Sequence, residues 1–330
     1  DDTANPVIVS CPVTRNIEGC NTSAITGPAF SSTPAASTEA EFEDATNQGN
    51  ASDICGITSV TYVDVATSTC PIVVSRTWTI SDVCGNSTSC VQTINVDDTA
   101  APTWNTAANA LDITLECSNL AGIAAAQAAA PVASDACDAS PTLNKTSGAF
   151  AQSTGCAQEG TYTNTWTATD DCGNTSTVFT QVITITDNTA PTWSTSIGNL
   201  DRTVECSDAT ALANAQTLFP VASDNCDLTV SALNKTSGSF VAGMVCPQEG
   251  TYTNTWTVTD DCGNTSTTYT QTITVTDNTP PTWVTVPGTL DRTVECSDAT
   301  GLAAAQTLEP VANDNCDLLL FPVKSAGMFQ

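Results

Sequence analysis

The sequence predicts an all-β chain of tandem two-sheet β-sandwich modules, each of about 90 residues, arranged as an extended rod. Three observations support this prediction. Trp104, Trp193 and Trp283 stand 89 and 90 residues apart within a long recurring motif, and such self-similarity indicates a repeat architecture. Within each period, apolar and polar residues alternate as in half-buried strands. Cysteines recur at matching positions in each period.

The repeat divides the chain into four modules. The segment 187–276 recurs almost verbatim on both sides, and a diverged copy fills 1–96, where Cys55, Trp78 and Cys84 stand for the same landmarks. We therefore predict complete modules at 1–96, 97–186 and 187–276 and an incomplete module at 277–330. The fourth copy still echoes 235–240 at 324–329. Since partners for Cys296 and Cys316 are missing from it, we expect either a continuing parent chain or strands supplied by another subunit.

The strands are read from side-chain alternation. Residues 161–169 read TYTNTWTAT, so Tyr162, Trp166 and Ala168 share one face while threonines line the other. Residues 178–186 alternate in the same way, and turn-forming Asp-Asn, Gly-Asn and proline pieces separate the runs. Short strands in a module of this size indicate an immunoglobulin-like sandwich. For the alanine-rich piece 207–218, a helix capped by Ser207 or Asp208 and a strand are both left open.

Composition excludes several functions. The chain carries 35 acidic and 7 basic residues and no histidine, for a net charge of −28. A nucleic-acid surface needs clustered lysine and arginine, so no nucleic-acid partner is expected. No apolar run reaches transmembrane length, which predicts no membrane insertion in this segment. Sixteen cysteines at regular spacing indicate an oxidising compartment, and zinc is not expected because there is no histidine and no Cys-x-x-Cys pair.

Strand geometry restricts the disulfides. Cys156 and Cys172 flank the strand 161–169, which holds its ends more than about 20 Å apart at ~3.3 Å per residue, whereas a disulfide needs Cα atoms within ~7 Å. If strand direction alternates, two cysteines of each module lie at its top and two at its bottom. The predicted pairs are Cys137–Cys172, Cys117–Cys156, Cys226–Cys262 and Cys206–Cys246.

The first module holds two additional cysteines, Cys11 and Cys90, at positions where the other copies have none. Because they occur together, we predict that they pair and join the first and last strands. The remaining predicted pairs of this module are Cys20–Cys70 and Cys55–Cys84.

The chain resembles the HYR family of immunoglobulin-like modules over essentially its whole length. The resemblance is carried by the segments DNTAP (187–191), ASDNC (222–226), TWTVTDDCGN (255–264) and TITVT (272–276). It is similar to the cysteine-rich form repeated in giant surface adhesins of Bacteroidetes, including gliding-motility adhesins. Cys11-Pro12 together with Cys90 is similar to the terminal-strand disulfide of that family. The resemblance implies an immunoglobulin-like fold and an extracellular or cell-surface location, and it indicates no particular ligand.

The function expected from these features is a structural and adhesive repeat segment of a secreted stalk or filament. Its partners would be other copies of the module or chain and cell-surface, extracellular-matrix or polysaccharide targets. The alternative is a set of carbohydrate-binding or accessory modules of a larger secreted hydrolase, with exposed Trp104, Trp193 and Trp283 as stacking platforms instead of packed side chains. No enzyme activity is expected here, because the pairs Asp170–Asp171 and Asp260–Asp261 recur in the repeats and a catalytic pair is rarely copied in this way.

Calcium is the expected cofactor, bound where one module meets the next. The bottom of a module should face the top of the following one, so carboxylates of both would gather at the linker. Clustered oxygen ligands bind calcium in extracellular modules, and the alternative is an acidic, solvated surface. The arrangement is similar to cadherin junctions, whose linkers also carry Asp-Asn before a proline. The predicted ligands are Glu116, Glu159, Asp187, Asn188, Asp224, Asp227, Asp260, Asp261, Asp277, Asp314 and Asp317.

Overall fold

The structure is a computed structural model that describes residues 2–230, 233–317, 320, 322–325 and 327. By its internal contacts the chain divides into two compact units. Unit 1 consists of Asp1–Leu115, Asn119–Ala151 and Gly160–Ile185. Unit 2 consists of Glu116–Ser118, Gln152–Glu159 and Thr186–Gln330. Two short pieces at one end of the second sequence repeat therefore belong to the unit that contains the third.

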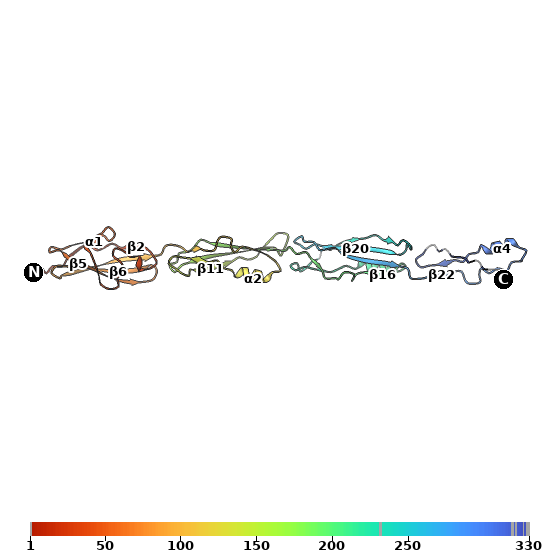
Figure 1. Ribbon diagram of the computed structural model, residues 1–330, viewed down its shortest axis with the longest axis horizontal. Helices are drawn as coiled ribbons and strands as arrows, with labels where there is room; N and C mark the ends of the chain where they lie inside the picture. Colours follow the sequence, from red (N-terminus) through yellow and green to blue (C-terminus); the bar gives the residue numbers. More distant parts are fainter. Residues whose placement is uncertain (1, 231–232, 318–319, 321, 326, 328–330) are drawn as a thin grey trace. The chain divides into compact units, whose positions relative to one another are not determined.

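The first repeat forms a five-stranded sheet of order β2-β7-β6-β5-β3 and a two-stranded sheet of β1 and β4. Figure 1 labels β2, β5 and β6 of the larger sheet. β2 pairs with β7 in parallel, and the other neighbours are antiparallel. Side chains of both sheets meet in one core, as a two-layer sandwich requires. The strands are β1 (Val7–Ser10), β2 (Arg15–Glu18), β3 (Ala35–Ser37), β4 (Asn50–Ser52), β5 (Ile57–Thr67), β6 (Ile72–Asp82) and β7 (Ser87–Asp97).

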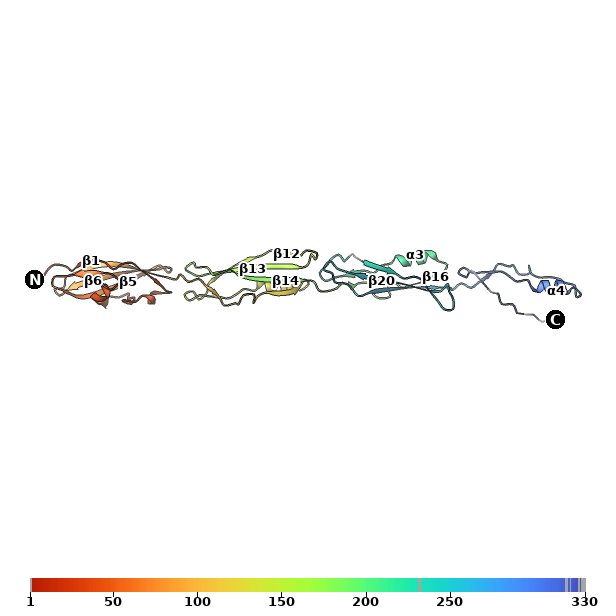
Figure 2. The same ribbon diagram turned by 90° about the horizontal axis from the view of Figure 1, so that it is seen from above.

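The second repeat has the sheet β11-β13-β14-β9, with β12 also on β13, and the pair β8–β10. β13 and β14 lie side by side (Figure 2). The predicted strands at 161–169 and 178–186 are confirmed by β13 and β14. The strands are β8 (Thr103–Trp104), β9 (Ile113–Glu116), β10 (Ala133–Ser134), β11 (Thr142–Ser147), β12 (Ala151–Gln152), β13 (Gly160–Thr169) and β14 (Phe179–Thr186).

The third repeat has the same arrangement, with the sheet β16-β21-β20-β18, β19 on β20, and the pair β15–β17. In the described part of the fourth repeat, β22 pairs with β23; the predicted echo at 324–329 lies partly outside the described residues. The strands are β15 (Thr192–Trp193), β16 (Arg202–Glu205), β17 (Ala222–Ser223), β18 (Leu233–Ser237), β19 (Val241–Ala242), β20 (Gly250–Val258), β21 (Tyr269–Thr276), β22 (Thr282–Trp283) and β23 (Ala312–Asn313).

A short helix follows the early strand of each later repeat. The alanine-rich piece left open between helix and strand is helical: in α3 the carboxylate of Asp208 accepts the N–H of Ala211 (2.8 Å) and caps the first turn. In α2 the side chain of Asn119 caps in the same way. The helices are α1 (Glu39–Phe42), α2 (Leu120–Ala128), α3 (Ala209–Thr217) and α4 (Ala299–Gln306), with a 3-10 turn η1 (Thr22–Ala24).

A buried tryptophan on the central strand anchors each complete repeat. Trp78, Trp166 and Trp256 are at most 2% exposed. The alternation seen in the sequence explains this, because Trp166 and Ala168 point into the core while the threonines between them stay at the other face. Burying an aromatic side chain of this size contributes roughly 1.5–3 kcal/mol.

The cores also hold hydrogen-bonded polar side chains, although Oδ1 of Asn164 and Oδ1 of Asn254 are buried without a partner. In the first repeat the guanidinium of buried Arg76 bonds both carboxylate oxygens of buried Asp64 (2.8 Å each). In the second repeat the amide of Asn164 donates to Gln127 of α2 (2.9 Å) and to Gln181 of β14 (3.0 Å). The polar network therefore ties the helix to the sheet, since a buried amide without partners would be costly.

Candidate functional site: the joints between repeats

The linker between the second and third repeats is held by carboxylates at the end of the second. Glu159 Oε1 accepts the N–H of Asp187 (3.2 Å), and Glu116 Oε1 accepts the N–H of Asn188 (3.1 Å). The hydroxyl of Thr189 donates to the same Glu116 oxygen (2.9 Å). The hydrogen bonds bring Glu116, Glu159, Asp187 and Asn188 together, as predicted from the sequence, and all four residues lie in unit 2.

Loops of the third repeat hold the other side of this linker. The amide of Asn264 donates to the main-chain oxygen of Asp187 (3.0 Å) and to Asp260 Oδ2 (3.0 Å). Next to it, the amide of Asn225 donates to the hydroxyl of Ser118 (2.9 Å). The end of the second repeat, the linker and the facing loops of the third repeat thus form one hydrogen-bonded joint.

The same joint occurs twice more. Between the first and second repeats, the carboxylate of Glu18 accepts both the N–H (3.0 Å) and the hydroxyl (2.7 Å) of Thr99, and the amide of Asn174 donates to the main-chain oxygen of Asp98 (2.7 Å). Between the third and fourth, Glu205 accepts from the N–H of Asn278 (3.2 Å). The repeated contacts follow from the repeated sequence, since Asp98 and Asp187 occupy matching positions.

Disulfides cross every joint. Among the described residues, five of the six disulfides connect a cysteine at one end of a repeat to a cysteine in the loops of the next repeat that face it. Their Cα atoms are 4.7–6.0 Å apart, the separation that a disulfide needs. The pairs that cross are Cys20–Cys137, Cys70–Cys172, Cys117–Cys226, Cys156–Cys262 and Cys206–Cys316.

The predicted pairings within repeats are therefore wrong. The assignment of cysteines to the two ends of a module was correct. A cysteine at one end, however, pairs with a cysteine of the next repeat, because the linker contacts bring the loops of that repeat against it. The pairs that the structure contradicts are Cys20–Cys70, Cys55–Cys84, Cys117–Cys156, Cys137–Cys172, Cys206–Cys246 and Cys226–Cys262.

The pair Cys11–Cys90 is confirmed. Cys11 follows β1 and Cys90 lies in β7, and their Cα atoms are 5.9 Å apart. This disulfide closes the first repeat on itself. The cysteines with free thiols in the structure are Cys55, Cys84, Cys246 and Cys296.

Carboxylate oxygens without a hydrogen-bond partner are buried at the joints. Asp187 is 3% exposed, and its Oδ2 atom is one of these oxygens. Burial, with the nearby charges of Asp224, Asp260 and Glu116, raises the pKa of Asp187 to about 6, although the N–H of Thr189 opposes the shift. Oδ2 of Asp98 at the first joint is buried in the same way, and burial raises the pKa of that carboxyl too.

The other predicted ligands are placed differently. Asp224 Oδ1 accepts the N–H groups of Cys226 (2.8 Å) and Asp227 (3.0 Å), while its Oδ2 is buried without a partner. Asp227 Oδ1 accepts the N–H of Thr229 (2.9 Å), so this carboxylate makes a hydrogen bond within its own loop. Asp314 and Asp317 repeat the contact of Asp224 with Asp227. Asp261 lies close to Cys156 and Cys262, and Asp277 lies close to Glu205.

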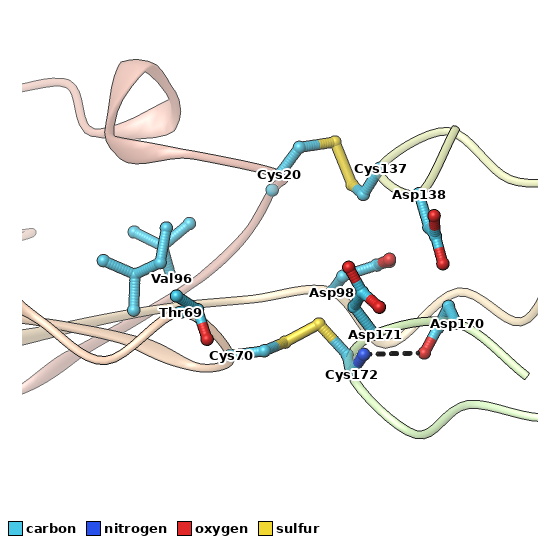
Figure 3. A pocket seen from close by; sticks show the side chains of 12 residues that line it. Cys20, Thr69, Cys70, Val96, Asp98, Cys137, Asp138, Asp170, Asp171 and Cys172 are labelled. Carbon is cyan, nitrogen blue, oxygen red and sulfur yellow. Dashed lines mark hydrogen bonds between the residues drawn. A yellow bond between two sulfur atoms is a disulfide. The ribbon is translucent and has the colours of Figure 1, made fainter. Parts of the chain in front are cut away.

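Figure 3 shows the first joint, where both disulfides flank a cavity lined by Asp98, Asp138, Asp170 and Asp171. Asp170 Oδ1 accepts the N–H of Cys172 (2.9 Å). This joint was absent from the predicted ligand set. The signal that would have revealed it is the match of Asp98 to Asp187 in the repeat.

The tryptophans considered as stacking platforms are partly packed. The indole N–H of Trp104 donates to the Thr177 carbonyl (2.8 Å), and the ring centroids of Trp104 and Phe179 are 5.4 Å apart. Trp193 repeats this with Thr267 (2.7 Å) and Tyr269 (5.5 Å). Trp283 of the fourth repeat is 61% exposed. The packing favours a structural role for Trp104 and Trp193.

The fold and the joints define a tandem β-sandwich repeat protein whose consecutive repeats are covalently cross-linked. Residues 106–185 and 195–275 match the family model of the HYR-like domain with 4 cysteines, which supports HYR-type repeats in this chain. No curated protein sequence matches the chain.

Three solved structures with a similar fold share little sequence with this chain. Drosophila N-cadherin EC1-4 is 13% identical, with 83% of this chain and 76% of that chain covered and a TM-score of 0.26. Human CDH23 EC21-23 is 9% identical, with 83% and 100% covered and a TM-score of 0.27. The fibronectin(III)-like modules of Clostridium thermocellum CbhA are 10% identical, with 55% and 94% covered and a TM-score of 0.19.

In the part of the chain that the structure describes, none of the helices combines the length and the hydrophobicity that a membrane span requires. The disulfides are typical of chains from an oxidising compartment, which suggests an extracellular or surface location.

Proposed function

We propose that this chain is a load-bearing structural and adhesive segment of a secreted cell-surface stalk or filament, of the kind found in bacterial surface adhesins. The observation that carries the proposal is the set of five disulfides that connect consecutive repeats. In an ordinary tandem array the single linker carries all tension between neighbours. Here each joint between the described repeats is crossed by the linker and by at least one disulfide.

The cross-links shorten the covalent path that tension follows. Force applied at the two ends passes through residues 1–20, crosses to 117–137, then to 206–226, and leaves through 316–330. At ~3.5 Å per residue this path is about 270 Å long, against about 1,150 Å for the whole unfolded chain. A stalk built in this way keeps its reach even when a sandwich unfolds.

Single-molecule stretching of the full chain tests this function. With disulfides intact, we expect the contour length to stop at about 270 Å, and after reduction to reach about 1,150 Å. The variant Cys206→Ser/Cys316→Ser should lengthen the oxidised chain by roughly 100 Å, because the path must then run through 262–330. The matched control Cys11→Ser/Cys90→Ser removes a disulfide that is off the path and should leave the length unchanged. An oxidised length near 600 Å would indicate pairing within repeats and defeat the proposal.

Calcium at the joints is the second part of the proposal. Its support is the buried carboxylate oxygen of Asp187 that has no hydrogen-bond partner, with Glu116 beside it. Carboxylate oxygens are the ligands that calcium prefers, whereas the neighbouring Cys117 and Cys226 are joined in a disulfide and are not ligands. Bound calcium would neutralise charges that otherwise repel in a low-dielectric site, and would hold the linker in place.

The partners proposed for such a stalk are other copies of the chain and surface, matrix or polysaccharide targets. The alternative function, accessory modules of a larger secreted hydrolase, is supported by exposed Trp283. Binding of soluble polysaccharide by the full chain, lost in Trp283→Ala, would favour that alternative.

A further inference from the structure

The first repeat presents an unoccupied copy of the cysteine-bearing loops that the later repeats use at their joints. Cys55 and Cys84 are exposed free thiols. The N–H of Cys55 donates to Asp53 Oδ1 (2.7 Å), and the N–H of Cys84 donates to Asp82 Oδ1 (2.9 Å). Neither thiol pairs with the other.

The second repeat shows what such loops bind. There the N–H of Cys137 donates to Asp135 Oδ1 (2.8 Å), and that of Cys172 to Asp170 Oδ1 (2.9 Å). In this repeat the two cysteines form disulfides with the end of the preceding one. The loops of the first repeat therefore have the backbone geometry of a joint.

The linker half of the joint is also present. Asp2 Oδ1 accepts the N–H of Ala4 (2.9 Å), as Asp98 Oδ1 accepts that of Ala100 (3.1 Å). The amide of Asn86 donates to the main-chain oxygen of Asp2 (3.2 Å), as Asn174 does to Asp98 (2.7 Å). Oδ2 of Asp2 is buried without a partner, like that of Asp98. The linker residues of the first repeat thus make the same hydrogen bonds as those of the second.

We infer that this face, formed by Asp2, Asp53, Cys55, Asp82, Cys84 and Asn86, docks the cysteine-bearing end of another sandwich module of the same class and closes two disulfides with it. The inference rests on the proposed role of the joints. By the pairing in the structure, Cys55 would join the cysteine that corresponds to Cys117, and Cys84 the one that corresponds to Cys156. In each bond two thiols lose two protons and two electrons, which a disulfide oxidant accepts as it is reduced to two thiols.

Two exposed apolar side chains restrict which module fits. Ile54 and Val83 precede the two cysteines and are 94% and 62% exposed. At the second joint these positions hold Asn225 and Asp261. The amide of Asn225 donates to the Ser118 hydroxyl (2.9 Å), and Asp261 Oδ2 accepts the N–H of Ala157 (3.5 Å). The docked module should therefore present apolar side chains where the second repeat presents Ser118.

The chemistry of Cys55 suits a thiol reserved for a docked partner. A hydrogen bond with the carboxyl of Asp2, together with burial and nearby negative charge, raises the pKa of Cys55 to about 11. Since only the thiolate attacks a disulfide, Cys55 should react slowly with small disulfides at neutral pH.

A fusion protein tests the inference. A copy of residues 97–185 is joined ahead of Asp1 of the full chain, with Cys137→Ser and Cys172→Ser in the added copy only, and is oxidised in a glutathione redox buffer. We expect peptide mapping without reduction to find Cys55 joined to Cys117 of the added copy, and Cys84 joined to its Cys156. Ser118→Val in the added copy should raise the yield of both bonds, and an unchanged yield would overturn the proposed apolar contact.

Failure of the docking inference can be distinguished from failure of the joints described above. If Cys55 and Cys84 stay free while Cys117 and Cys226 of the original chain remain paired, the docking inference fails and the joint architecture stands. A second measurement does not depend on folding of the fusion. Excess glutathione disulfide, left with the 330-residue chain long enough to offset the slow reaction of Cys55, should give separate mixed disulfides at Cys55 and Cys84. An internal Cys55–Cys84 bond would overturn the inference.

Discussion

Asn174 holds the linker of the first joint by donating its side-chain amide to the main-chain oxygen of Asp98 (2.7 Å). The same amide also donates to Asp170 Oδ2 (2.9 Å), and Asp170 Oδ1 accepts the Asn174 N–H (2.8 Å). One side chain thus connects the linker to the loop that bears Cys172. Asn86 and Asn264 make the corresponding contacts in the first and third repeats.

Replacement of Asn174 by Asp should weaken the first joint. The change removes both donated hydrogen bonds and places a carboxylate beside Asp170, so we expect a loss of about 1–3 kcal/mol in the free energy of unfolding. Chemical denaturation at pH 7 measures it. Asn144→Asp makes the same change on an exposed strand residue and should cost less than about 0.5 kcal/mol. Equal effects of the two variants would show that the Asn174 contact is not stabilising.

Asp187→Asn should stabilise the chain at pH 7 in the presence of a chelator. Because the pKa of Asp187 is raised to about 6, the folded state binds more protons than the unfolded state between pH 4 and 6. Wild-type stability from this group therefore rises as pH falls through that window. The advantage of the Asn variant should shrink over the same window. Glu309→Gln removes a charge at an exposed position and is the control.

Calcium should reverse the order of these two proteins. If Asp187 is a ligand, millimolar calcium raises the melting temperature of the wild type and leaves that of Asp187→Asn unchanged. Thermal unfolding monitored by circular dichroism measures both. Identical melting of the wild type with calcium and with chelator would remove calcium from the proposal and leave the buried charge as a cost of the joint.

Gln181→Met should destabilise the second repeat by about 2–4 kcal/mol. Gln181 is 1% exposed, and its amide donates to the carbonyls of Leu111 (3.0 Å) and Ala126 (3.1 Å) while its oxygen accepts from Asn164 (3.0 Å). Methionine fills the space but can make none of these hydrogen bonds. Gln152→Met, on the exposed strand β12, is the control. A small effect of Gln181→Met, similar to that of the control, would show that packing and not hydrogen bonding dominates this core.

Removal of Arg76 should be costly unless its partner is removed too. Arg76→Asn leaves the buried Asp64 carboxylate unpaired, and we expect about 3–5 kcal/mol of destabilisation. The second repeat holds Asn164 and Ser147 at these paired positions. The double variant Asp64→Ser/Arg76→Asn should therefore be more stable than Arg76→Asn alone. A double variant that is less stable than the single one would contradict this coupling.

Local pattern predicted much of each repeat correctly. The alternation of Tyr162, Trp166 and Ala168 predicted a half-buried strand, and β13 confirms it, because side-chain direction in a strand is set by the backbone itself. The shared occurrence of Cys11 and Cys90 predicted their pairing. The alanine-rich piece was undecided, since its weak amphipathic pattern fits either state, and the cap at Asp208 with packing of Ala215 in the core makes it helical.

By itself the sequence determined the period, the strands, the acidic linkers and the two ends to which the cysteines belong. The tertiary structure decided which cysteines meet. Chain spacing excludes a pair such as Cys156 with Cys172 only because an extended strand separates them; it gives no distance between loops of different repeats. Contacts of Glu116 and Asn264 with the linker set that distance, and they bring Cys117 to Cys226 and Cys156 to Cys262.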